Sequence, residues 1–173
     1  MSDSPTFVIR PVHADDIDAL CAIYNHAVRH TTATMDVEER TADQQALWIA
    51  AHNGAPYPGI VAVADDGAVV GYGSLSPFNP KPGYARTVEN SVYVHPDRRG
   101  RGVGRALLAA LLEDATRRGF TTIIALISSD NAASLRLHEQ LGFTQAGMLR
   151  RVGHKHGGWV DVAYLQLLLD TDP

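Results

Sequence analysis

The sequence predicts an α/β fold of the α+β kind, in which a mixed central β-sheet is flanked by helices on both faces. Apolar residues recur at helical spacing in some segments, and short β-branched runs lie between those segments. The predicted order is one strand, two helices, three strands, a helix, a strand, a helix and two strands. With 45% hydrophobic residues, the 173-residue chain is expected to form a single domain over 1–173, with its core at about 6–169.

Local signals place the elements of the first half. A strand at 7–10, helices at 17–28 and 41–53, and a hairpin of two strands within 59–76 are expected. Thr41 and Gln44 form a T-x-x-Q capping box, whose side chains satisfy free amides at the start of the second helix. The pair Asp66-Gly67 favours the turn of the hairpin, because Gly accepts the left-handed backbone that such turns need.

The second half follows a proline-rich loop at 78–83. The expected elements are a strand at 87–94, a helix at 102–118, a strand at 121–127, a helix at 131–141, and strands at 144–152 and 160–168. Pro96 ends the first of these strands, and Gly119 is typical of a helix C-terminus. The final two strands are expected to flank a turn at Gly157-Gly158.

Charge and cysteine content exclude several classes of protein. The formal charge of −4 gives no general attraction to nucleic acid or to a membrane surface. The single Cys21 cannot form an internal disulfide, and the longest apolar run, at 106–112, is far too short to span a bilayer. The sequence therefore predicts a cytoplasmic protein that uses neither nucleic acid nor membrane as a partner.

A strand leads into a helix through a glycine-rich and arginine-rich turn. Gly100, Gly102 and Gly104 would let an anion approach the free amides of the helix N-terminus. The surrounding cations are Arg98, Arg99, Arg101 and Arg105. Neither a P-loop nor a dinucleotide G-x-G-x-x-G fits, because the latter would need glycine at Arg105. The turn predicts a diphosphate site, the alternative being a turn with solvated arginines.

These motifs resemble a known family. The run at 98–105 resembles the acetyl-CoA signature Q/R-x-x-G-x-G/A of the GNAT acetyltransferases, and 131–143 resembles their downstream N-x-x-A/S-x-x-L and G-F element. More narrowly, the chain resembles the phosphinothricin and methionine sulfoximine N-acetyltransferases over nearly its whole length. The segments that carry this second resemblance are 25–28, 57–58, 87–94, 136–139 and 155–159.

The resemblance implies a GNAT fold, acetyl-CoA as the acetyl donor, no metal, and a homodimer. The strand residues Val92, Tyr93 and Val94 would hold the pantetheine arm and thioester, through the amides of Val92 and Val94. Asn131 and Ser134 would contact the same molecule. The pyrophosphate would be bound by Arg99, Gly100, Arg101, Gly102, Val103, Gly104 and Arg105.

Glu89 is the candidate general base. Acetyl transfer needs a neutral amine, and Glu89 lies in an apolar strand where burial would raise its pKa toward neutrality. The alternative is a carboxylate paired with Arg86 or Lys81. His138 is the candidate proton donor to the departing thiolate, or a residue that contacts acetyl-CoA without proton transfer. Tyr93 is an alternative donor, since period-2 alternation places it on the strand face of Glu89.

The amine substrate is expected to be small and amino-acid-like. Its predicted walls are 28–35, 78–86 and 154–159, with Lys81, Tyr84 and Arg86 joining Glu89 as substrate-binding residues. Met35 stands where related sequences often carry an aromatic residue, which leaves the choice of amine open.

Two rival functions remain at this point. One is an acetyltransferase of the same fold that acts on a protein N-terminus or a polyamine, and the other is a non-catalytic acyl-CoA-binding module. Metal and covalent chemistry are not expected. His26 and His30 form a pair only, and Cys21 lies on the apolar stripe of its helix.

Overall fold

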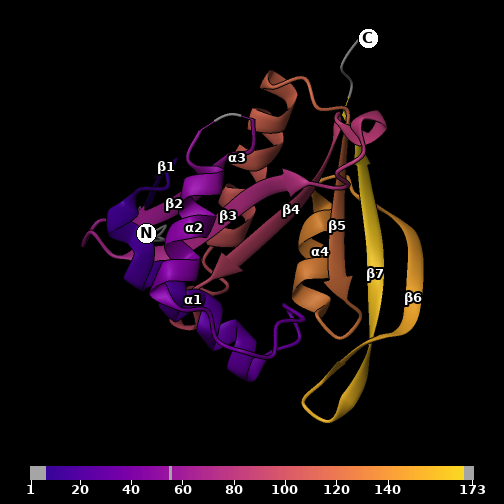
Figure 1. Ribbon diagram of the computed structural model, residues 1–173, viewed down its shortest axis with the longest axis horizontal. Coiled ribbons are helices and arrows are strands. Elements are labelled where there is room, and N and C mark those ends of the chain that lie inside the picture. The colour runs from indigo at the N-terminus through magenta and orange to yellow at the C-terminus, as the bar shows by residue number, and fades with distance from the viewer. Residues whose placement is uncertain (1–6, 55, 170–173) are drawn as a thin grey trace, which may run out of the picture.

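A seven-stranded sheet with the order β1-β2-β3-β4-β5-β7-β6 forms the centre of the computed structural model (Figure 1). The structure describes residues 7–54 and 56–169, so the outermost parts of the predicted domain, 1–6 and 170–173, lie outside the described residues. The β4–β5 pair is parallel and the other pairs are antiparallel, which makes the sheet mixed as predicted. The strands are β1 (Phe7–Pro11), β2 (Gly59–Ala64), β3 (Val69–Pro77), β4 (Thr87–Val94), β5 (Thr122–Ser128), β6 (Thr144–Lys155) and β7 (Gly158–Leu168).

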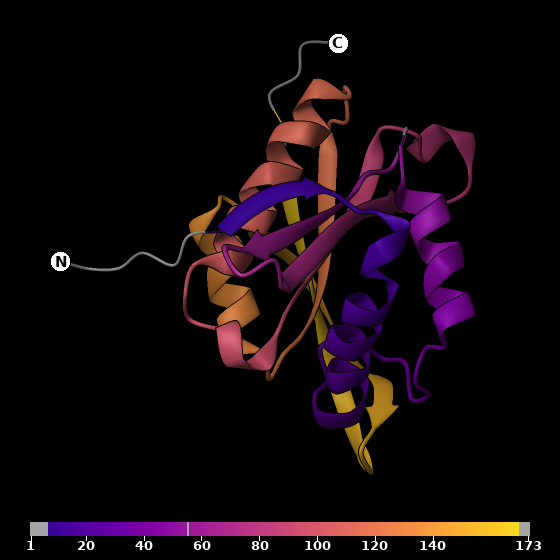
Figure 2. The same ribbon diagram turned by 90° about the vertical axis from the view of Figure 1, so that its left-hand side faces the viewer.

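Helices cover both faces of the sheet, which confirms the predicted layers (Figure 2). One face carries α1 and α2, and the other carries α3 and α4. Their bounds are α1 (Ile17–His30), α2 (Ala42–His52), α3 (Val103–Arg117) and α4 (Ala132–Gln140), with short 3-10 turns at Ala14–Asp16, Pro82–Tyr84 and Pro96–Arg98.

Each layer is held by its own apolar core. On the α1 face, Leu20 and Tyr24 pack with Tyr72 of the sheet, and all three are buried. On the α3 face, Leu108 and Leu111 pack on a group that includes Val88 and Ile123. Burial of each such side chain contributes about 1.5–3 kcal/mol, so the two cores fix the sheet between the helices.

The structure confirms most local predictions and moves several boundaries by a few residues. Thr41 and Gln44 form the predicted capping box at the start of α2. The helix α3 begins after Gly102, because the φ of Gly102 is +81°, outside the helical region. The turn of the last hairpin lies at His156 and Gly157, not at Gly157-Gly158. Both turn residues have positive φ, 51° and 77°, as a two-residue hairpin turn requires, and Gly158 already belongs to β7.

The strands β4 and β5 separate halfway along their length. Their parallel pairing covers Thr87 to Glu89 of β4 and ends at the pair Glu89 and Ile124. In Figure 1 the two strands diverge beyond that point. The remaining residues of β4 keep their pairing with β3 on the other side. The divergence therefore exposes one edge of β4 inside the sheet.

Candidate active site

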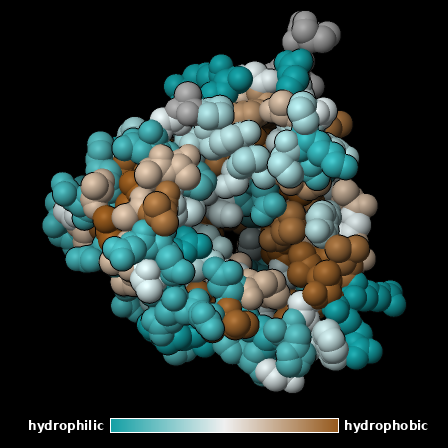
Figure 3. Space-filling view, in the orientation of Figure 1, coloured by the Kyte–Doolittle hydropathy of each residue, from teal (hydrophilic) through white to brown (hydrophobic). Residues whose placement is uncertain are grey.

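A cavity of about 360 Å³ lies where β4 and β5 diverge. Both strands, the segment after α1, the start of α4 and the β6–β7 hairpin contribute to it. A hollow near the centre of Figure 3 opens among these elements. The lining residues are Thr32, Ala33, Thr34, Met35, Glu89, Asn90, Ser91, Val92, Tyr93, Ala125, Leu126, Ile127, Ser128, Asn131, Ser134, His138, Val152, Gly153, Val162 and Tyr164.

The exposed edge of β4 offers backbone amides to this cavity. The amide of His95 donates to Val70, across the β3 side of the strand. Because the backbone groups of successive residues point to opposite edges, the N–H groups of Val94 and Val92 face the side where β5 has diverged. An extended ligand with amide groups can pair with such an edge. The predicted role of these two amides thus fits the geometry.

The side chains of β4 alternate between the two faces of the sheet. Tyr93 packs against Tyr24 of α1, with ring centroids 5.2 Å apart, so its face is the α1 face. Glu89 lies on the same face by alternation. Asn90 points the other way and reaches His138 of α4. The predicted base and the predicted acid therefore reach the cavity from opposite faces of the sheet, Glu89 from β4 and His138 from α4.

Glu89 has the environment expected of a general base. Its side chain lines the cavity, and burial raises the pKa of its carboxyl. The ion pairs formed within residues 7–54 and 56–169 do not include Glu89, so the alternative pairing with Arg86 or Lys81 is absent from the described structure. A half-buried carboxylate beside a cavity can accept a proton from a bound amine.

His138 is buried and held at both ring nitrogens. Its Nδ1 lies 2.8 Å from the carbonyl oxygen of Ser134 and therefore carries the proton. Its Nε2 lies 2.9 Å from Nδ2 of Asn90, which donates to it. Burial lowers the pKa of His138, which favours this neutral form. In this arrangement His138 has no proton directed into the cavity. Sequence reasoning missed Asn90; its signal was a polar residue in an apolar strand.

Tyr93 provides a second possible proton donor. Its ring stacks on Tyr72 at 5.3 Å and contacts Tyr24 edge-on. Burial raises the pKa of Tyr93, so its hydroxyl stays protonated at neutral pH. The residue lines the cavity on the face of Glu89.

The predicted phosphate loop lies between β4 and α3. Gly100 and Gly102 have φ of 72° and 81°, a conformation that suits glycine, and a Cβ added at either position would have no atom within 4 Å. Gly104 differs, because a Cβ there would contact Leu137 of α4 at 3.4 Å. The amides at the start of α3 are thus open to an anion, while Gly104 allows α3 to pack closely on α4.

The arginines of this loop fall into two groups. Arg98 pairs with Asp66 at 3.4 Å and supports the loop from the β2–β3 hairpin. Within the described parts of the chain, Arg99, Arg101 and Arg105 are exposed and take part in no ion pair. Three unpaired guanidinium groups beside a helix N-terminus suit a diphosphate.

The start of α4 forms the next part of the wall. Asn131 caps this helix, because its side chain accepts the amide of Ser134 at 3.2 Å. Both residues line the cavity, as their predicted contact with acetyl-CoA requires. The cap also orients the turn of helix that carries His138.

The other end of the cavity is closed by the segment at 31–36 and the β6–β7 hairpin. The segment at 31–36 contributes Thr32, Thr34 and Met35, which lie within the predicted wall at 28–35. The hairpin contributes Val152 and Gly153, which lie just before the predicted wall at 154–159.

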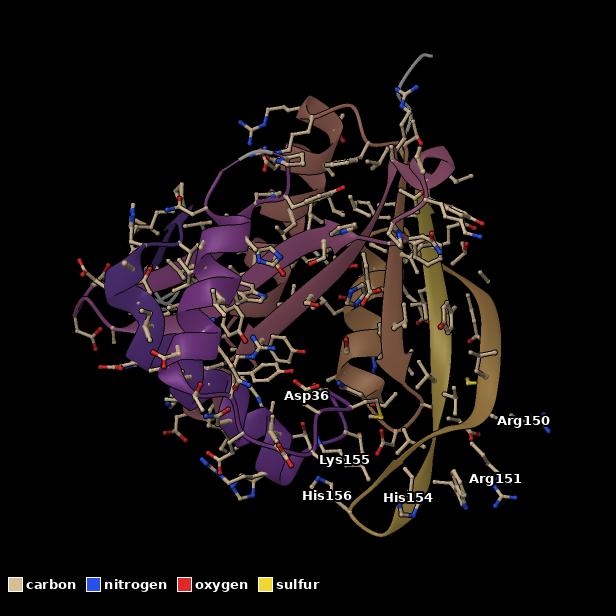
Figure 4. All side chains as sticks on the ribbon, viewed as in Figure 1. Asp36, Arg150, Arg151, His154, Lys155 and His156 are labelled. Atoms are coloured by element: carbon tan, nitrogen blue, oxygen red, sulfur yellow. The ribbon has the colours of Figure 1, made fainter. Side chains whose placement is uncertain are left out.

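A buried lysine joins these two segments. Lys155 donates to the carbonyl oxygen of Thr34 at 2.6 Å, and its side chain lies close to Asp36 (Figure 4). Burial lowers the pKa of Lys155, and Asp36 opposes this effect. His156 adds a second contact, with Nε2 3.3 Å from the carbonyl oxygen of Thr31. The hairpin therefore fixes the position of the 31–36 segment.

The third predicted wall lies elsewhere. Lys81, Tyr84 and Arg86 are exposed and are not among the lining residues described above. Tyr84 contacts Phe78 edge-on, and Nε of Arg86 donates to the carbonyl oxygen of Gly119 at 3.2 Å. Their part in binding the amine stays a prediction.

Comparison with known proteins identifies the family. The model of the acetyltransferase (GNAT) family matches residues 20–143, which include β4, the phosphate loop and α4. The chain belongs to this family. Its seven-stranded mixed sheet and its helices are the GNAT fold predicted from the sequence.

Individual relatives are similar over nearly their whole length. The chain is 42% identical to an L-methionine sulfoximine/L-methionine sulfone acetyltransferase of Salmonella typhimurium, covering 94% of each chain. It is 38% identical to a phosphinothricin N-acetyltransferase of Streptomyces coelicolor, covering 91% of this chain and 94% of the relative. The structure of yncA, a putative acetyltransferase from Salmonella typhimurium with its cofactor acetyl-CoA, matches with a TM-score of 0.93 at 40% identity. That match covers 97% of this chain and 96% of the other.

No described helix has the length and apolar character needed to cross a bilayer. No group of three or more His, Cys, Asp or Glu side chains within 7–54 and 56–169 is arranged to hold a metal ion.

Proposed function

We propose that this GNAT enzyme transfers the acetyl group of acetyl-CoA to the primary amine of a small amino-acid-like substrate. One observation carries the proposal. The unpaired Glu89 carboxylate lines the same cavity as the exposed edge of β4, whose Val92 and Val94 amides suit a pantetheine arm. The relatives that act on methionine sulfoximine, methionine sulfone and phosphinothricin support the class of substrate.

In this proposal the amine attacks the thioester carbonyl directly. Glu89 removes the proton that the amine nitrogen must lose, and the C–N bond forms as the C–S bond breaks. The proton on Glu89 later passes to solvent. The amides at the start of α3, with Arg99, Arg101 and Arg105, hold the diphosphate, so the thioester is fixed before the amine arrives.

The departing thiolate needs a proton, and we assign this donation to Tyr93, whose hydroxyl regains a proton from solvent after CoA leaves. His138 accepts a hydrogen bond at Nε2 and donates at Nδ1 to a backbone carbonyl, so it directs no proton into the cavity. Tyr93 is protonated and lines the cavity on the same strand face as Glu89. In this scheme His138 positions Asn90 and the strand that carries the thioester-binding amides.

An acidic groove would favour a polyamine or a protein N-terminus as the substrate. A more open depression does lie next to the cavity, between the 35–40 segment and α2, with Asp36, Glu38 and Glu39 in its lining. Two of these acids are neutralised. Glu39 pairs with Arg29 at 2.6 Å, and Asp36 lies 3.7 Å from Arg40. The remaining charge is small, so the small amine is the better substrate.

We also propose that the enzyme works as a homodimer in the cytoplasm. The resemblance to the phosphinothricin and methionine sulfoximine enzymes supports the dimer. The single, half-buried Cys21 is consistent with a reducing compartment. Sedimentation of the purified protein tests the dimer.

The release of CoA tests the central proposal. Purified protein is incubated with acetyl-CoA and a panel of amino acids, polyamines and a peptide, and free thiol is measured. We expect release above background only with small amino acids or their analogues. If CoA is released only with the polyamine or only with the peptide, the result would support the rival function, acetylation of a polyamine or a protein N-terminus. Tight binding of acetyl-CoA without release on any amine would indicate a non-catalytic module.

A further inference from the structure

The described lining of the cavity lacks a cation for a group that every amino acid carries. An amino-acid substrate brings its α-carboxylate into the site together with its amine. Among the described residues that line the cavity, none is lysine or arginine, and Glu89 is the acidic one. A carboxylate that leaves water without a cationic partner costs several kcal/mol. The lining described for one chain is therefore incomplete as an amino-acid site.

Several cations of the same chain are engaged outside this lining. Lys155 donates to a backbone carbonyl oxygen, and Arg40 lies over the ring of Tyr24 at 3.9 Å. Arg86 donates to another backbone carbonyl oxygen, and Lys81 is exposed on the same loop, outside the lining. A cation from outside the described lining is therefore needed to bind the carboxylate.

An exposed apolar surface borders the cavity. We call Met35, Leu126, Leu149 and Val152 the apolar rim; their exposed fractions are 38%, 38%, 44% and 54%. Met35, Leu126 and Val152 line the cavity, and Leu149 pairs with the lining residue Val162. Figure 3 shows an apolar surface beside the central hollow. Large apolar groups that stay exposed beside a cavity mark a surface that gains by being covered.

A bulge of β6 carries two arginines beside this rim. The pairing of β6 with β7 shifts between Leu149 and Gly153, so three residues of β6 lie opposite Asp161. Arg151 has a φ of 54°, and its amide donates to the carboxylate of Asp161 at 2.7 Å. Bulges re-aim side chains and are frequent next to active sites. In Figure 4 this bulge directs Arg150 and Arg151 outward from the hairpin.

Charge complementarity favours a second copy of this chain as the partner of the rim. The ion pairs formed within the described residues include neither Arg150 nor Arg151, and they also leave Glu89 unpaired. Glu38, in the depression next to the cavity, is unpaired as well in that part of the chain. In Figure 4 Asp36 marks this acidic side, and the two arginines lie at the right-hand edge. A twofold contact across the rim places the basic side of each copy against the acidic side of the other.

We infer that the active enzyme is a twofold dimer in which the partner subunit's Arg150 binds the α-carboxylate of the amino acid beside Glu89. In a twofold contact centred on the rim, a residue beside the rim of one copy lies against the cavity side of the other. A guanidinium binds a carboxylate through two parallel hydrogen bonds. This inference rests on the proposed acetyl transfer and names the group that recognises the carboxylate of its substrate.

A mixed dimer tests the contribution of the partner. Glu89→Gln and Arg150→Gln chains are co-expressed with different affinity tags, and the doubly tagged dimer is isolated. One of its two sites combines an intact Glu89 with the intact Arg150 of the other chain, and the second site lacks both. We expect about half of the wild-type kcat per dimer, with a KM for L-methionine sulfone near that of the wild type. A KM as high as that of the Arg150→Gln dimer would overturn the inference, because Arg150 would then act within its own chain or not at all.

The carboxylate is tested by a neutral analogue. Arg150→Gln should raise the KM for L-methionine sulfone by about tenfold or more and leave the KM for its carboxamide nearly unchanged. Arg117→Gln is the matched control for charge, since Arg117 is 74% exposed at the end of α3, and it should change neither KM. The same increase for the amino acid and its carboxamide, or no increase for either, would contradict the inference.

Calorimetry and sedimentation separate this inference from the proposed function. L-Methionine sulfone is titrated into protein saturated with CoA, which cannot transfer acetyl. Weaker binding to Arg150→Gln than to wild type and Arg117→Gln supports the inference even if acetyl-CoA gives no CoA release, a result that would reject the acetyl transfer alone. Equal binding by all three proteins, or no binding by any, overturns the inference. A monomeric wild type at the concentration at which it binds the amino acid does so as well.

Discussion

The two ends of the cavity are built in different ways. The proposed acetyl-CoA end consists of the β4 edge and the start of α4, and the loop at 99–105 follows β4 outside the lining of the cavity. The proposed amine end lies on segments far apart in the sequence and consists of Thr32, Thr34, Met35, Leu126, Val152 and Gly153. The first end and the adjoining loop present backbone amides and arginines, which suit a charged ligand. In the second end, an apolar contact of Met35 with Gly153 and a hydrogen bond from the buried Lys155 fix the position of the 31–36 segment.

This difference suggests how one fold can retain acetyl-CoA as its acetyl donor while the amine that it acetylates changes. Backbone amides at a strand edge and a helix N-terminus persist through most side-chain substitutions, because the fold itself supplies them. The amine end depends on individual side chains, such as Met35 against Gly153. Substitutions there should alter the preferred amine while leaving acetyl-CoA binding intact.

The largest effect should come from Glu89, which lies between the two ends. Glu89→Gln removes the base but keeps the shape, so turnover should fall by roughly a hundredfold to ten-thousandfold. The affinity for acetyl-CoA, measured by calorimetry, should hardly change. Unchanged turnover would remove Glu89 from the mechanism.

The pH dependence of kcat/KM provides an independent test of Glu89 as the base. Burial raises the pKa of Glu89, and the base acts only when ionised. Activity should therefore be present above this pKa and lost as the pH falls through it, at a higher pH than an ordinary glutamate would give. The acidic limb of kcat/KM should vanish from the residual activity of Glu89→Gln.

The next largest effect should come from Gly102, where a substitution should weaken the binding of acetyl-CoA but not of the amine. Gly102→Val places a β-branched residue at a φ of +81° and should distort the amides that face the diphosphate. We expect acetyl-CoA affinity to fall by on the order of tenfold or more. The KM for the amine, measured at saturating acetyl-CoA, should stay near its wild-type value.

Gly119→Val is the matched control for backbone strain. Gly119 has a φ of +78°, lies at the opposite end of α3, and like Gly102 has no atom within 4 Å of an added Cβ. Both variants should lose similar stability, about 1–2 kcal/mol or somewhat more. If Gly119→Val weakens acetyl-CoA binding equally, the effect of Gly102→Val is one of general misfolding.

A smaller effect should come from Lys155, where a substitution should raise the KM for the amine. Lys155→Met leaves the carbonyl of Thr34 without its donor, so the 31–36 segment should become less ordered. We expect the KM for the amine to rise by about threefold to tenfold, with kcat and the KM for acetyl-CoA changed less. Arg117→Met removes an exposed cation of a surface ion pair with Asp114 at the end of α3 and should leave both KM values near wild type. A rise in both KM values for Lys155→Met would contradict a role confined to the amine end.

The smallest effect concerns the loop that lies outside the cavity lining. Arg86→Gln should change kcat/KM for the amine by no more than about twofold, as expected of an exposed surface position. A tenfold loss confined to the amine would instead place Arg86 in the substrate site, as the sequence predicted. Steady-state kinetics with methionine sulfone distinguish the two results.

The sequence by itself determined the parts of the protein that are local. The capping box of α2, the strand, loop and helix at 87–117, and Glu89 as the candidate base all follow from short-range spacing and from a family signature. Such features depend on residues within a few positions of one another, so their physics is readable along the chain.

Only the tertiary structure decided how distant segments meet. The pairing of β4 and β5 ends at Glu89 because the two strands diverge, and no local pattern encodes that divergence. Asn90 lies against Nε2 of His138, a contact that supports our proposal of Tyr93 as the proton donor, and Lys155 binds the backbone of Thr34 across 121 positions. These contacts arise from the packing of a sheet between two helical layers, where the register of distant elements sets which side chains share a cavity.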